Sequence, residues 1–196
     1  MTIPPYLYKG FRKEKYAIEF LEKGKFRLYL LEYYRIIEDE NRRDESEGQS
    51  ESIVSKYLPD FTLYLKGSHI NPLYPFCTSG PNVDLQYMKA KWPYVVKISD
   101  PKKLKQFLTE KKPVNTKMGI FGRCRLEKVS YTKREPIDID PDSFEAVRLT
   151  YIQKPRSYEN ECEFRYIITA LPPANHQPDK FLEYNFGIKI DYASFI

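Results

Sequence analysis

Residues 94–110 read YVVKISDPKKLKQFLTE, and this stretch contains the clearest strand signal and the clearest helix signal of the chain. Tyr94–Ile98 is a short run of β-branched and apolar residues, which predicts a buried strand. Asp100 then fits the N-cap of a helix, and Pro101 fits its first position. The residues that recur at helical spacing and form the apolar stripe are Leu104, Phe107 and Leu108.

Strand signals dominate the chain on both sides of this stretch. A second helix is predicted for Lys13–Lys23, because its apolar residues share one face and Gly24 follows it. Strands do not alternate regularly with helices, which argues against a doubly wound parallel sheet. We therefore expect an α+β fold of mostly antiparallel, curved sheets with two or three helices. The other predicted strands are Tyr6–Phe11, Phe26–Tyr34, Phe61–Leu65, Leu73–Cys77, Gly119–Val129, Glu145–Gln153, Glu161–Thr169 and Tyr184–Ile190.

The length of the chain, 196 residues, fits one domain that spans residues 1–196. The stretch at residues 38–55 is charged, rich in serine and almost without apolar residues, which predicts a long mobile loop. No second core pattern follows that would indicate another domain.

Composition narrows the cellular setting. No stretch of 18 apolar residues occurs and the N-terminus is too polar for a signal peptide, so we expect a cytoplasmic protein that does not span a membrane. Three cysteines without CxxC spacing predict neither a disulfide framework nor a metal site. The net charge of +5 is compatible with nucleic acid, nucleotide or acidic protein partners and selects none of them.

The most informative chemical pattern is ECEFRYIIT at residues 161–169. Side chains alternate along a strand, so Glu161, Glu163 and Arg165 are predicted to share one face. Two carboxylates about 7 Å apart can contact one ligand while Arg165 holds one of them. The same pattern is also typical of a solvated sheet face with a surface Glu–Arg pair, which contributes little stability.

Two further stretches carry candidate ligand contacts. LYPFCTS at residues 73–79 ends in the small hydroxyl residues Thr78 and Ser79, which allow a ligand close to the backbone. YLYKGFR at residues 6–12 places Tyr8, Lys9 and Arg12 around Gly10, a position that permits close approach. Arg27 is an alternative basic position on the next predicted strand.

In this order, the motifs resemble those of the ADP-ribosyltransferase superfamily. Its Arg-Ser-Glu class has an arginine on an early strand, a Ser-Thr-Ser-like strand and a late (Gln/Glu)-x-Glu. The resemblance implies an ADP-ribosyltransferase-like fold, NAD as substrate without a metal, and a macromolecular acceptor. It implies that Glu163 is the catalytic glutamate and that Glu161 orients or deprotonates the acceptor. The remaining predicted NAD contacts are Tyr8, Gly10, Arg12 or Arg27, Thr78, Ser79 and Arg165.

A second, more diffuse resemblance covers residues 6–167. The elements Asp44–Gly48, Phe76–Ser79, Trp92–Pro101 and Lys154–Arg165 resemble those of the DUF2971-like proteins, a bacterial and phage family of unknown function. This resemblance implies that the three charged residues of the late strand are important, and it fits a role in conflict between phage and host.

A different class of function also fits the sequence. The small size, basic balance and abundant tyrosine are compatible with a non-catalytic phage or bacterial defence or anti-defence protein that binds a host protein or nucleoprotein complex. A lysine-rich helix at residues 102–112 indicates RNA as a further partner, although a protein partner is favoured over nucleic acid.

Overall fold

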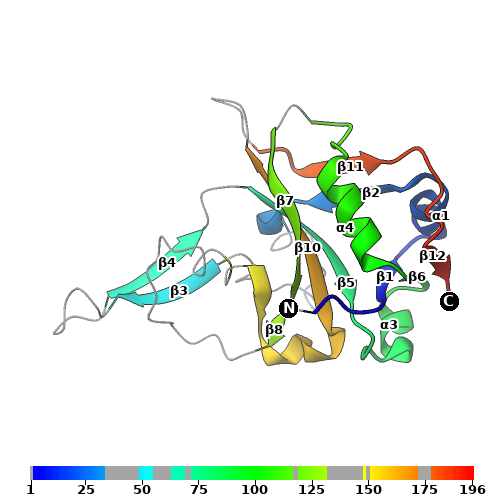
Figure 1. Ribbon diagram of the computed structural model, residues 1–196. Helices are drawn as coiled ribbons and strands as arrows, with labels where there is room; N and C mark the ends of the chain where they lie inside the picture. Colours follow the sequence, from blue (N-terminus) through cyan, green and yellow to red (C-terminus); the bar gives the residue numbers. More distant parts are fainter. Residues whose placement is uncertain are drawn as a thin grey trace.

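The computed structural model describes residues 2–33, 49–54, 63–68, 72–116, 119–131, 148, 151–171 and 178–196 (Figure 1). Its centre is a six-stranded sheet of order β12-β6-β1-β5-β10-β7, in which every neighbouring pair is antiparallel. The strands of this sheet are β1 (Leu7–Phe11), β5 (Leu73–Ser79), β6 (Tyr94–Ile98), β7 (Gly119–Lys128), β10 (Glu163–Leu171) and β12 (Ala193–Phe195).

One face of the sheet carries the larger hydrophobic core. Alternate strand residues such as Phe76 and Tyr166 pack there under helices α1 (Glu14–Lys23) and α4 (Pro101–Glu110). The two-stranded antiparallel sheet of β2 (Lys25–Tyr29) and β11 (Phe181–Asn185) completes this layer.

The opposite face carries two smaller apolar clusters. Tyr8 and Val95 lie on this face with helix α3 (Leu85–Lys91), whereas Leu73 and Ile167 pack against the 3₁₀ turn η1 (Leu31–Tyr33). Their sequence neighbours belong to the larger core, as the alternation of side chains along a strand requires. Short parallel strands β8 (Ser130–Tyr131) and β9 (Gln153–Lys154) pair with each other, and the 3₁₀ helix η2 (Arg156–Glu161) leads into β10.

Local signals explain the helix boundaries. The Asp100 carboxylate accepts a hydrogen bond from the backbone N–H of Lys103 at 3.0 Å, which confirms the predicted N-cap of α4. α1 ends at Gly24, whose φ of 58° lies in the left-handed region that glycine adopts readily. α3 escaped sequence prediction because its seven residues bury only Met88, although Asp84 caps it.

Mixed helix and strand content with mostly antiparallel pairing is therefore confirmed. The described residues contain α1, α3, α4 and a fourth helical segment that includes Tyr151–Ile152. The prediction was two or three helices. The predicted strand Glu145–Gln153 is wrong at Arg148, Tyr151 and Ile152, which are helical, whereas Gln153 begins β9. Residues 145–147 and 149–150 lie outside the described residues. Apolar runs this short do not distinguish a strand from a buried helical turn.

The predicted loop at residues 38–55 is also wrong in part. Gln49–Val54 forms β3, which pairs with β4 (Leu63–Ser68), because cross-strand backbone hydrogen bonds form a hairpin even between polar residues. Residues 38–48 and 55 lie outside the described residues. The predicted strand Phe26–Tyr34 ends at Tyr29, and η1 follows it.

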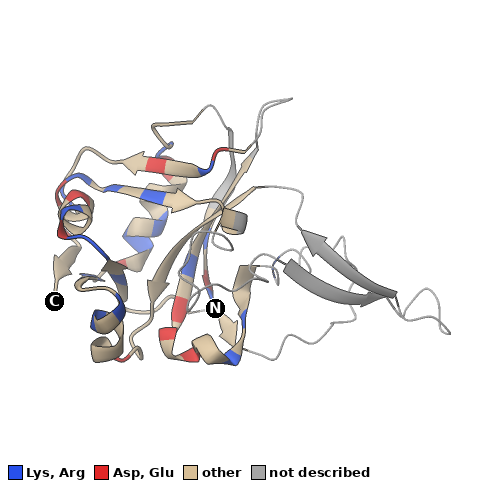
Figure 2. Cartoon of the chain, turned by 180° about the vertical axis from the view of Figure 1, so that it is seen from behind, with Lys and Arg blue, Asp and Glu red and all other residues tan. Residues whose placement is uncertain are grey.

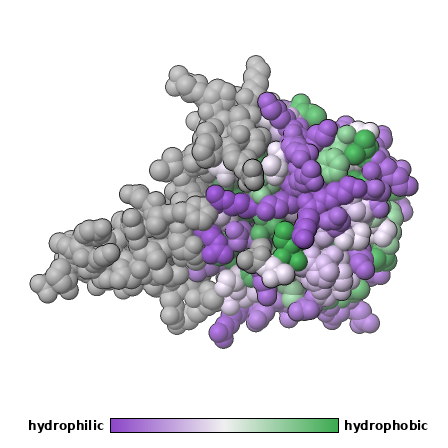
Figure 3. Space-filling model, in the orientation of Figure 1, coloured by the Kyte–Doolittle hydropathy of each residue, from purple (hydrophilic) through white to green (hydrophobic). Residues whose placement is uncertain are grey.

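The surface over α4 is polar. Figure 3 shows that this side of the molecule is mainly hydrophilic, with smaller hydrophobic patches. In the part of the chain that the structure describes, no helix is long and apolar enough to cross a membrane.

Candidate functional site

Three neighbouring strands bring the predicted motifs together. β5 lies between β1 and β10, and the pairing aligns Tyr8 with Ser79 and Ser79 with Glu163. Residues paired across antiparallel strands project to the same face, so these three side chains form one row across the sheet. The aromatic strand, the Thr-Ser strand and the Glu-x-Glu strand of the sequence are therefore adjacent.

Glu163 lies at one end of this row, and it is 4% exposed. Nε of Arg165 contacts Oε1 of Glu163 at 2.8 Å, and Nη2 contacts Oε2 at 3.3 Å, so the guanidinium binds both oxygens. Nζ of Lys154 lies 2.9 Å from Oε2. Arg165 is itself 2% exposed, and its Nη1 donates to the carbonyl of Tyr151 at 2.8 Å. The predicted Glu–Arg pair is therefore buried and does not lie on a solvated sheet face.

These contacts fix the charge of Glu163. Burial alone would raise the pKa of its carboxyl, but the charges of Arg165 and Lys154, with hydrogen bonds from Arg165 and Cys77, hold that pKa well below its usual range. Glu163 is therefore an anion at neutral pH. The pKa of the Cys77 thiol is raised well above its usual value by burial and by the Glu163 charge, so Cys77 is present as a neutral thiol.

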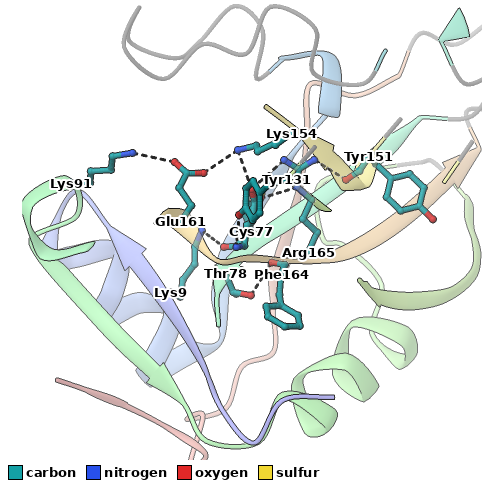
Figure 4. A network of polar contacts seen from close by, with 11 residues as sticks. Lys9, Cys77, Thr78, Lys91, Tyr131, Tyr151, Lys154, Glu161, Phe164 and Arg165 are labelled. Atoms are coloured by element: carbon teal, nitrogen blue, oxygen red, sulfur yellow. Dashed lines mark hydrogen bonds and ion pairs between the residues drawn. The ribbon is translucent and has the colours of Figure 1, made fainter. Parts of the chain in front are cut away.

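Glu161 does not lie on the same strand face, contrary to the prediction. It ends η2, and Cys162 between the two glutamates has a φ of 46°, which turns the chain before β10 begins. The bend nevertheless brings both carboxylates to one cation, because Nζ of Lys154 lies 3.1 Å from Oε2 of Glu161. Nζ of Lys91 contacts Oε1 of Glu161 at 3.2 Å (Figure 4).

Hydroxyl groups fix the backbone around this cluster. The N–H of Glu163 donates to the hydroxyl oxygen of Tyr131 at 2.6 Å, and the Thr78 hydroxyl donates to the carbonyl of Phe164 at 2.9 Å. Burial and the Glu163 charge raise the pKa of Tyr131, which keeps its hydroxyl protonated. Thr78 thus connects β5 to β10, while Ser79 lies beside Glu163 in the row.

The basic residue of β1 that contacts β5 is Lys9. Its Nζ donates to the carbonyl of Cys77 at 2.9 Å and lies 4.7 Å from the centre of the Phe76 ring. Arg12 follows the end of β1 and is exposed. Arg27 lies on β2, where it pairs with Glu183 at 2.8 Å. The structure therefore does not bring either predicted arginine to Glu163.

Gly10 permits close approach, as its sequence predicts, and the group that approaches is the indole of Trp92. A Cβ added at Gly10 would lie 2.5 Å from atoms of that side chain. Tyr8, which is 8% exposed, packs edge-on against Tyr6 with ring centres 5.4 Å apart. Burial and Tyr6 raise the pKa of Tyr8.

Three cations therefore contact two carboxylates. We call this set the ionic network; it consists of Lys91, Lys154, Glu161, Glu163 and Arg165. Figure 2 shows acidic residues on η2 and at the start of β10, as well as on elements outside the network. The sequence pattern indicated Lys9 only as a neighbour of Gly10 and Lys154 only as the first residue of the Lys154–Arg165 element. It gave no signal for Lys91 or Tyr131.

Comparison of the chain with protein-family models, with curated proteins and with solved structures found no significant match.

Proposed function

We propose that this protein transfers ADP-ribose from NAD to a macromolecular acceptor. The observation that supports the proposal is the row of Tyr8, Ser79 and Glu163 across three adjacent strands, with an ionised carboxylate at its end. The motif order that resembles the ADP-ribosyltransferase superfamily corresponds to three strands that are neighbours in space. The resemblance alone did not require that adjacency.

In this proposal the bond between C1 of the ribose and N1 of nicotinamide breaks, and its electron pair leaves with nicotinamide. Positive charge develops on the ribose, and an anion close to it lowers the barrier. Glu163 suits this role because it stays ionised, and it accepts a hydrogen bond from a ribose hydroxyl. Nζ of Lys154 lies 2.9 Å from Oε2 of Glu163. When NAD binds, the ribose hydroxyl displaces this ammonium group and donates its hydrogen bond to Oε2.

The acceptor then forms the new bond to C1 with its lone pair and gives up a proton. Glu161 is the carboxylate assigned to receive that proton, because its side chain is 12% exposed against 5% for Glu163. Tyr8 and Ser79 border the nicotinamide position.

The test is nicotinamide release from NAD, with proteins of a bacterial lysate as acceptors and biotin-labelled NAD to capture the product. Wild type releases nicotinamide and labels a protein, whereas Glu163→Gln and Glu163→Asp do neither. Circular dichroism and a thermal melt establish that at least one of these variants is folded. Release by a folded Glu163→Gln variant at the wild-type rate, or no release by wild type, refutes the proposal.

The burial of Glu163 supports a second candidate function. A carboxylate that is 4% exposed and bound by two cations also serves as a structural cross-link between β9 and β10. In that case the protein is a non-catalytic defence or anti-defence protein that binds a host protein. Two results together support this candidate. Calorimetry shows no binding of NAD, and both wild type and Glu163→Gln specifically capture the same partner protein.

A further inference from the structure

The outer end of the ionic network borders two aromatic rings. Nζ of Lys91 lies 4.6 Å from the centre of the Tyr87 ring and 5.8 Å from that of Trp92, and both side chains are half-buried. Helix α3 carries Tyr87 and Lys91, and it packs on the sheet face where Tyr8 lies. Aromatic rings and Glu163 therefore stand at the two ends of one continuous array.

Each link of this array is a short contact. Glu163 contacts Lys154 at 2.9 Å, Lys154 contacts Glu161 at 3.1 Å, and Glu161 contacts Lys91 at 3.2 Å (Figure 4). The exposure of the lysine side chains increases along it, from 11% at Lys154 to 24% at Lys91. Lys91 therefore marks the more exposed end of the array, and Glu163 marks its buried end.

The charge of the network favours an anionic ligand. Three cations contact two carboxylates, which leaves an excess of one positive charge. The diphosphate bridge of a dinucleotide carries two negative charges at neutral pH. Ammonium groups form strong, charge-assisted hydrogen bonds to phosphate oxygens.

Aromatic rings beside a phosphate-binding cation are typical of nucleotide sites. Any base can stack on an aromatic side chain, because stacking does not depend on the pattern of hydrogen-bond donors and acceptors on the base. We propose that Tyr87, Lys91 and Trp92 form the subsite for the adenosine diphosphate half of NAD. Lys91 and Lys154 hold the diphosphate, and the adenine stacks on the exposed aromatic surface. This inference rests on the proposed function, since Glu163 is the end of the array assigned to the nicotinamide ribose.

ADP is the probe that tests the subsite, because it contains this half of NAD and lacks the bond that the transferase breaks. Trp92 is the only tryptophan of the chain, so its fluorescence reports directly on the subsite. We expect ADP to quench Trp92 and to bind in calorimetry. Lys91→Met raises the Kd for ADP about tenfold or more, while the Kd for nicotinamide mononucleotide changes by less than about threefold.

Lys89→Met is the matched control, since Lys89 is exposed on the same helix and is not part of the network. It leaves the Kd for ADP unchanged. Lys91→Arg keeps the positive charge and retains most of the affinity, which separates loss of the cation from damage to the fold. An unchanged Kd for ADP in Lys91→Met, or no binding of ADP to wild type, overturns the inference.

The two proposals fail in different ways. Binding of ADP that depends on Lys91, without nicotinamide release from NAD, leaves the nucleotide subsite in place and refutes the transferase. Nicotinamide release that depends on Glu163, with ADP affinity insensitive to Lys91, leaves the transferase in place and refutes the subsite.

Discussion

Replacement of Arg165 by methionine removes the bidentate partner of a carboxylate that is 4% exposed. Loss of one partner from a buried ion pair costs about 3–5 kcal/mol, because the remaining charge keeps its desolvation penalty. Lys154, whose Nζ lies 2.9 Å from Oε2 of Glu163, remains available as a second partner. We therefore expect the lower end, a loss of about 3 kcal/mol in the free energy of unfolding.

A double-mutant cycle separates the ion pair from its surroundings. Glu163→Leu alone leaves the Arg165 guanidinium buried without its carboxylate, and it also destabilises the fold by about 3 kcal/mol. The double variant Glu163→Leu/Arg165→Met removes both charges, so its cost is smaller than the two single costs together by about 2 kcal/mol or more. Urea unfolding, followed by Trp92 fluorescence and circular dichroism, measures all four proteins.

The matched control is Arg27→Met. Arg27 contacts Glu183 at the same 2.8 Å distance, but its side chain is 48% exposed. Solvent screening limits such a pair to about 0–1 kcal/mol. If Arg165→Met costs no more than Arg27→Met, or if the single costs are additive in the double variant, the argument from burial is refuted.

Acid titration checks the same pair independently. The pKa of Glu163 is held below its ordinary value of 4.5, so the unfolded chain takes up this proton before the folded chain does. The stabilisation of the fold by the ion pair is complete above pH 4.5, the ordinary pKa of a glutamate. It is lost as the pH falls through the lowered pKa of Glu163 in the folded chain. Wild type therefore loses more stability than Glu163→Leu between pH 5 and strongly acidic solution.

Two backbone predictions follow from glycine and left-handed positions. Gly10→Ala places a Cβ 2.5 Å from the Trp92 side chain, so the free energy of unfolding in urea is expected to fall by about 1–3 kcal/mol. The Trp92 fluorescence emission is expected to shift as well. Stability and emission equal to those of wild type contradict the close packing. Cys162→Gly keeps the φ of 46°, and its free energy of unfolding is expected to stay within about 1 kcal/mol of wild type. Cys162→Val is expected to be about 1–2 kcal/mol less stable than Cys162→Gly, because a β-branched residue is strained at this φ. Equal stability of the two variants shows that the bend is not strained.

Local patterns were sufficient for much of the sheet and for two helices. Tyr94–Ile98 and the N-cap of α4 follow from residues close in sequence, and the structure confirms both. The strand prediction for residues 145–153 failed at Tyr151 and Ile152, because a short buried apolar run does not distinguish a strand from a helical turn. α3 failed because a seven-residue helix that buries one residue gives almost no periodic signal.

The sequence by itself determined which residue types were available: an aromatic strand, a Thr-Ser strand and a Glu-x-Glu strand, in that order. Only the tertiary structure decided the register that aligns Tyr8, Ser79 and Glu163, because register depends on pairing between strands far apart in the chain. It also decided the cations. Lys91 and Lys154 come from two separate elements. They meet the carboxylates because a charged glutamate taken out of water requires positive partners from any segment that can reach it.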